Sequence, residues 1–70
     1  MDEKTKELVG IAASIAGHCQ PCLLYHLKEA EKLQISSKEI NEAIELAKAI
    51  SQSGDKNMVE FAERRLKRGR

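Results

Sequence analysis

The stretch Gly17-His18-Cys19-Gln20-Pro21-Cys22-Leu23-Leu24-Tyr25-His26 contains both cysteines, both histidines and the only proline of the chain. Proline is preorganised for the first position of a helix, so Pro21 predicts a helix that is capped by Gln20 and continues to about Leu33. The Cα atoms of two cysteines three positions apart in a first helical turn lie about 5 Å apart, within the range that a disulfide needs. The stretch therefore predicts a helix start that carries a closable cysteine pair.

The same stretch favours reactive thiol chemistry. Cys22 lies in the predicted first turn, where unpaired N–H groups and the positive end of the helix dipole favour a thiolate over a thiol. His26 follows four residues after Cys22 and seven after Cys19, so all three side chains share one helix face and a base lies within reach of a thiol. His18, directly before Cys19, is a weaker candidate because a turn can simply expose it.

The segment before the cysteines predicts a helix from Glu3 to Ala16, capped by Asp2 or Thr5. Glu7 borders the apolar stripe of this helix and lies about ten residues, or ~15 Å, back from the turn. We therefore expect Glu7 to reach His26 more easily than Cys22, or to act in a neighbouring subunit. The stripe repeats at helical spacing and consists of Leu8, Ile11, Ala12 and Ile15.

The segment after the cysteines opens with a capping box, Ser36-x-x-Glu39, and its apolar residues continue at helical spacing to Ile50. The run Ser51-Gln52-Ser53-Gly54 predicts a break, after which Asp55 would cap a fourth helix. We expect Met58 and Phe61 of that helix to cover the core or a subunit contact. No strand pattern is present, so the predicted fold is all-α, a small bundle of three or four helices.

Length and composition bound the remaining possibilities. Seventy residues form a single domain, 1–70, which buries only about 60% of the surface that its unfolded chain exposes. With one Phe, one Tyr and no Trp the core must be aliphatic, and such a domain commonly completes its burial by forming a homo-oligomer. No segment resembles a membrane span or a signal peptide, so we expect a cytoplasmic protein. We interpret the basic end, Arg64 to Arg70, as a solvated helix end rather than a nucleic-acid contact.

Taken in order, the residues also resemble a known family. Glu7, Cys19-x-x-Cys22-x-x-x-His26, Ala30 and the helix start Ser36-Ser37-Lys38-Glu39-Ile40 resemble the carboxymuconolactone decarboxylase superfamily, specifically its alkylhydroperoxidase D-like (AhpD-like) branch. The likeness runs from about residue 7 to residue 50. It implies an all-helical, oligomeric thiol enzyme that reduces peroxides or passes electrons to a peroxidase partner and needs neither a metal nor another cofactor.

The resemblance also implies a role for each residue of the motif. Cys22 would attack the peroxide and become a sulfenic acid, Cys19 would resolve it into a disulfide, and His26 and Glu7 would form a proton relay. An external dithiol or reductase would then reset the pair. On helix-end electrostatics alone, Cys19 is an equally acceptable attacking residue. Gln34 stands where the family usually has a glycine, so we expect it to adopt a left-handed conformation or to end the helix differently.

Other interpretations of the cysteine pair fit the residues less well. A c-type haem site needs a histidine directly after the second cysteine, where this chain has Leu23. Zinc could take Cys19, Cys22 and His26, but a structural site needs a fourth ligand from His18 or a second subunit. A helical assembly or metal-binding module without redox turnover is therefore the alternative to a thiol oxidoreductase. A purely structural disulfide is disfavoured because closing so short a loop constrains the unfolded chain little.

Overall fold

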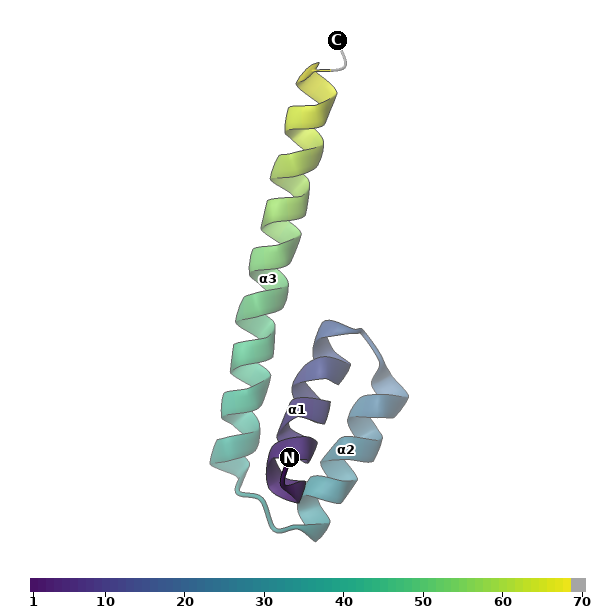
Figure 1. Cartoon of the computed structure of the whole chain (residues 1–70), viewed down its shortest axis with the longest axis vertical. Coiled ribbons are helices and arrows are strands. Elements are labelled where there is room, and N and C mark those ends of the chain that lie inside the picture. Colours follow the sequence, from purple (N-terminus) through teal and green to yellow (C-terminus); the bar gives the residue numbers. More distant parts are fainter. Residues whose placement is uncertain (69–70) are drawn as a thin grey trace.

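The chain folds into three helices without a strand in the part that the computed structural model describes, residues 1–68. The helices are α1 (Glu3–Ala16), α2 (Gln20–Lys32) and α3 (Ser37–Arg68). α1 packs against both of the others, whereas the backbones of α2 and α3 do not contact each other within the described residues (Figure 1). The prediction of a small all-α bundle is confirmed.

α1 has the predicted bounds because its cap is encoded locally. The Asp2 carboxylate accepts a hydrogen bond from the backbone N–H of Thr5 at 2.7 Å, which lowers the pKa of Asp2. Ile11 is completely buried on the inner face of α1. Glu7 and Ser14 are buried on the same face of α1. They lie four residues before and three residues after Ile11, which is the spacing of one helix face.

α2 begins at Gln20, one residue earlier than predicted, and its end follows the expectation for Gln34. This residue has a φ of 57°, the left-handed conformation that usually calls for glycine, and α2 ends two residues before it. Ala30 is buried in the α1–α2 contact, but Leu24 is 68% exposed. The apolar residues of α2 are therefore only partly covered.

α3 begins as the capping box predicts, with the N–H of Glu39 donating to Oγ of Ser36 at 3.2 Å. It then continues to Arg68 through residues 51–54. The predicted break and fourth helix are wrong, and Asp55 lies inside α3 instead of capping a new helix. None of the residues at 51–54 is a proline, so each keeps its N–H for the helix ladder, and the single glycine costs only about 1 kcal/mol.

The long third helix gives the molecule an extended shape. Its radius of gyration is 16.0 Å and its principal extents are 55 × 21 × 19 Å, whereas a compact domain of this length would have a radius near 11 Å. The part of α3 from residue 51 to 68, here called the free half of α3, extends past the end of α1 and α2 (Figure 1). Met58 and Phe61 are exposed on it and do not cover the core of this chain.

Two further expectations concern the basic C-terminal segment and a membrane-spanning helix. Arg64 and Arg65 belong to the last turns of α3, while Gly69 and Arg70 of the predicted basic end lie outside the described residues. Among residues 1–68, no helix combines the length and apolarity needed to span a membrane.

Candidate functional site

The two cysteines form a disulfide where α2 begins. The Cα atoms of Cys19 and Cys22 are 5.3 Å apart, as the spacing predicted. Cys19 itself is the N-cap of α2, and its Sγ accepts a hydrogen bond from the N–H of Cys22 at 3.3 Å. The predicted cap, Gln20, is wrong: Gln20 is already helical, because the sulfur of Cys19 takes the acceptor role that a side-chain oxygen usually has.

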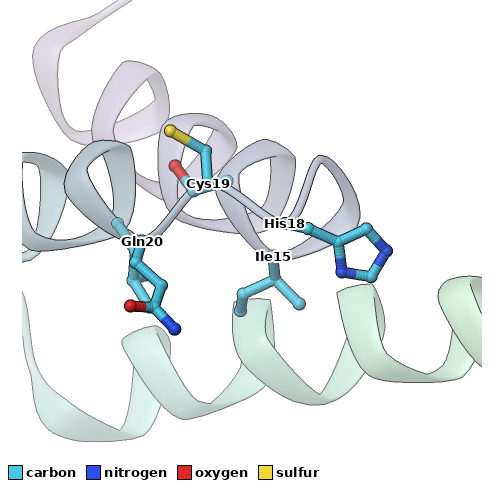
Figure 2. A pocket seen from close by; sticks show the side chains of 6 residues that line it. Ile15, His18, Cys19 and Gln20 are labelled. Atoms are coloured by element: carbon cyan, nitrogen blue, oxygen red, sulfur yellow. The ribbon is translucent and has the colours of Figure 1, made fainter.

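The two sulfur-bearing residues differ in exposure. Cys22 is exposed, whereas Cys19 is half-buried beside a hollow of about 220 Å³ whose wall includes Ser14, Ile15 and His18. Figure 2 shows the sulfur of Cys19 on the opposite side of the loop from the side chains of Ile15 and Gln20, which point toward α3. The sulfur of Cys19 therefore faces away from α3, and Cys22 is the more exposed residue of the pair.

His18 occupies the turn between α1 and α2. It is exposed and has a φ of 55°, a left-handed conformation that a non-glycine residue adopts only when the turn requires it. The turn is held by backbone bonds, including one from the N–H of Cys19 to the carbonyl of Ser14 at 2.9 Å. His18 lines the hollow beside Cys19, and its backbone N–H donates a hydrogen bond to the carbonyl of Ile15 at 3.2 Å.

A buried carboxylate and a histidine meet one turn further along α2. Oε2 of Glu7 lies 3.0 Å from Nδ1 of His26, and Glu7 is only 6% exposed. Glu7 thus reaches His26 within a single chain. Since a carboxylate accepts hydrogen bonds, the contact places the proton of a neutral imidazole on Nδ1 and leaves Nε2 with its lone pair. The arrangement orients the imidazole ring.

Gly10 makes this contact possible, and the sequence analysis did not identify it. A Cβ atom at position 10 would lie 2.5 Å from Nδ1 of His26, closer than real Cβ contacts allow. The carbonyl of Gly10 also accepts a hydrogen bond from the hydroxyl of buried Ser14 at 2.6 Å. The available signal was a glycine inside a predicted helix, one turn after Glu7, because such a glycine usually has a packing reason.

Tyr25 precedes the histidine on α2 and contacts its ring. Its ring meets that of His26 edge to face, with centroids 5.1 Å apart, and Tyr25 is 59% exposed. Glu7 and Tyr25 both line a second hollow between α1 and α2, together with Lys6 and Lys32. Buried Glu7 therefore has a polar route to the surface on the side away from the disulfide.

The described residues do not form the group of side chains that a zinc site needs. Among residues 1–68, no three His, Cys, Asp or Glu side chains are grouped so that they could hold a metal ion. Both cysteines are engaged in the disulfide, and His26 turns one ring nitrogen to Glu7.

These features define the class of protein. It is all-helical, with a Cys-x-x-Cys disulfide at the start of α2 and a contact between a glutamate of α1 and a histidine of α2. The model of the carboxymuconolactone decarboxylase family matches residues 1–63, so the chain belongs to that family. Searches of curated proteins and of solved structures returned no match.

Proposed function

We propose that this protein is a thiol-dependent peroxidase or dithiol–disulfide oxidoreductase of the AhpD-like branch, acting in antioxidant defence. One observation carries the proposal. The Cys19–Cys22 disulfide lies at the start of α2, one turn before His26, and a buried carboxylate holds that histidine from α1. Family membership supports a redox role for such a pair.

The first step oxidises one sulfur by two electrons. In the reduced protein the thiolate of Cys22 attacks the nearer oxygen of a hydroperoxide, the O–O bond breaks, and the leaving oxygen takes a proton to form an alcohol or water. Cys22 becomes a sulfenic acid. Cys22 suits this role because it lies in the first turn of α2, where the helix end favours the thiolate, and because it is exposed to an incoming oxidant.

The second step forms the observed bond. The thiolate of Cys19 attacks the sulfenic sulfur of Cys22, the S–O bond breaks, and hydroxide leaves as water after taking a proton. In the disulfide the two Cα atoms are 5.3 Å apart, within the range usual for such a bond. An external dithiol then attacks the disulfide through a mixed disulfide, returns two thiols to the protein and leaves as a disulfide itself.

Glu7 and His26 would handle the protons of these steps. His26 would accept the proton of the attacking thiol and return it to the leaving oxygen, while Glu7 orients the ring and stabilises the imidazolium between the two transfers. The hollow lined by Lys6 and Lys32 gives Glu7 a route for proton exchange with solvent that does not cross the disulfide. When a partner's disulfide replaces the peroxide, the same groups serve thiol–disulfide exchange.

Consumption of peroxide in the presence of dithiothreitol tests the proposal. We expect turnover in the wild-type protein and none in Cys22→Ser. Assayed without dithiothreitol, Cys19→Ser should reduce a single peroxide per chain, because it forms the sulfenic acid but cannot resolve it internally. Reversed behaviour of the two variants would assign the attack to Cys19. Wild-type turnover in Cys22→Ser would contradict the attack by Cys22. Stoichiometric zinc with no turnover in the wild type would instead favour the metal-binding assembly module.

A further inference from the structure

The imidazole of His26 has a third neighbour besides the two that α1 supplies. Glu7 meets its Nδ1 at 3.0 Å, and Gly10 leaves room for the ring. The third neighbour is Tyr25 of α2 itself, whose ring lies edge to face against the imidazole, with centroids 5.1 Å apart and an angle of 80° between the planes. Neither the proton relay nor the disulfide chemistry proposed above uses this tyrosine.

The contact between the two rings does not follow from the helix alone. Tyr25 and His26 are consecutive in α2, and consecutive residues of a helix project in directions that do not face each other. A ring contact between them therefore depends on the side-chain orientation of both residues. Edge-to-face packing at this centroid distance is an arrangement that aromatic rings favour.

Burial does not explain the position of Tyr25. The residue is 59% exposed, whereas the residue that α2 buries is Ala30. Tyr25 instead lines the polar hollow between α1 and α2 together with Glu7, and the side chain of His26 is itself 24% exposed. The tyrosine ring thus lies beside the Glu7–His26 pair and not in a core.

The hydrogen bond to Glu7 leaves the imidazole one soft degree of freedom. The torsion about the bond from Cβ to the ring has broad minima in histidine, so the ring can tilt while Nδ1 stays near the carboxylate. Such a tilt changes the direction in which Nε2 and its lone pair point. It also changes the angle between the imidazole and the ring of Tyr25, so the edge-to-face contact opposes it.

We propose that Tyr25 is a positioning residue that fixes the tilt of the His26 ring. Glu7 determines which ring nitrogen carries the proton, and the aromatic ring of Tyr25 determines the direction of the other nitrogen. The acting group is the ring and not the phenol hydroxyl, because the ring makes the contact. The effect on turnover rests on the proposed thiol chemistry, whereas the contact that holds the imidazole does not.

Proton NMR of the oxidised protein tests the contact without an assay of activity. The ring current of Tyr25 should displace the C–H signals of His26, and His18, for which residues 1–68 hold no ring contact, is the internal reference. Both are read on the alkaline plateau of their titrations, so that protonation does not contribute. The displacement should remain in Tyr25→Phe and vanish in Tyr25→Leu. Equal shifts for the two histidines in the wild type would overturn the proposal.

The rate of disulfide formation tests the positioning role. Reduced protein is mixed with hydrogen peroxide without dithiothreitol, and the remaining thiols are titrated over time. Tyr25→Leu should react about 2- to 10-fold more slowly than the wild type, the ratio that corresponds to the free energy of an edge-to-face pair. Tyr25→Phe should keep the wild-type rate. An equal loss in Tyr25→Phe would assign the effect to the hydroxyl and overturn a role of the ring.

Two controls separate positioning from a general change in α2. Leu24→Ala shortens another exposed side chain, one residue earlier, and should leave the rate unchanged. In a His26→Ala background, Tyr25→Leu should cause no further loss, because a residue that acts through the imidazole has nothing left to position. A further loss of the same size would contradict the proposal. Circular dichroism and urea unfolding show that each variant keeps its fold.

The NMR and rate experiments distinguish a failure of this proposal from a failure of the proposed function. If the wild type forms no disulfide with peroxide, the proposed function is wrong and the effect of Tyr25 on turnover falls with it, while the NMR shift still decides whether the tyrosine holds the ring. If the wild type reacts and Tyr25→Leu matches its rate, the positioning role is overturned and the thiol chemistry stands.

Discussion

The packed end of the molecule and the free half of α3 use the same kind of helix pattern with opposite results. At the packed end, α1 buries Ile11 and Glu7 between two neighbours, and a glycine brings His26 within 3.0 Å of the carboxylate. In the free half, a glycine opens onto empty space and Met58 and Phe61 face solvent. The comparison shows that an amphipathic repeat predicts a contact surface but not whether the same chain supplies the contact.

The largest expected effect is the loss of peroxide consumption when His26, at the packed end, is removed. We expect His26→Ala to slow peroxide consumption by about 10²–10⁴-fold, the range for loss of a positioned acid–base group. Glu7→Gln, which keeps the size of the side chain and loses its charge, should slow it less. Rates measured across pH, with dithiothreitol as reductant, check both.

The native mass of these two variants is the control for this comparison. It should match that of the wild type, because neither Glu7 nor His26 lies on α3. A wild-type pH–rate profile in His26→Ala would remove the histidine from the relay and leave the Glu–His contact a structural one.

The two glycines offer a direct comparison of the regions. Gly10→Ala should destabilise the protein by about 1–3 kcal/mol, the usual cost of overpacking, because the new methyl group meets the ring of His26. Gly54→Ala should stabilise α3 by about 0.5–1 kcal/mol because no neighbour opposes the added Cβ. Urea unfolding measures both changes.

Gly10→Ala should also lower the rate of peroxide consumption, because a displaced His26 can no longer hold its contact with Glu7. Unchanged stability and rate in this variant would show that the close approach of α1 and α2 does not position the ring. A loss of stability with an unchanged rate would limit Gly10 to packing.

The smallest expected effect concerns the contact that joins α1 to the start of α3. Lys4 forms an ion pair with Glu39 and, together with the Ser36 hydroxyl, lowers the pKa of Glu39 from its ordinary value of 4.5. Because the folded pKa is the lower one, the contribution to stability is present above about pH 4.5 and is lost as the pH falls through the folded value.

Glu39→Gln should therefore be slightly less stable than the wild type at neutral pH and equally stable at about pH 2, where both side chains are uncharged. Thermal unfolding at the two pH values checks this. A difference that persists in acid would assign the effect to the shape of the side chain rather than to its charge.

The sequence predicted the parts of this fold that depend on neighbours along the chain. The cap at Asp2, the capping box at Ser36, the left-handed Gln34 and the Cα separation of the cysteines all follow from residues within one or two turns. The reach of Glu7 to His26 was predicted from helix lengths because α1 and α2 are joined by a short turn.

The remaining features depend on how residues from different helices pack against each other. The role of Gly10 becomes visible only once His26 is placed against it, and the sulfur cap of Cys19 only once the disulfide exists. The continuity of α3 through residues 51–54 was missed because propensity alone cannot decide between a break and a poorly supported helix.

The most direct test of the central claim is a thiol titration of the metal-free, reduced protein before and after one equivalent of hydrogen peroxide, then after dithiothreitol, with mass spectrometry on each sample. The account predicts that both thiols disappear with a mass decrease of two hydrogens and that dithiothreitol restores them. Thiols that stay reduced in peroxide would contradict it.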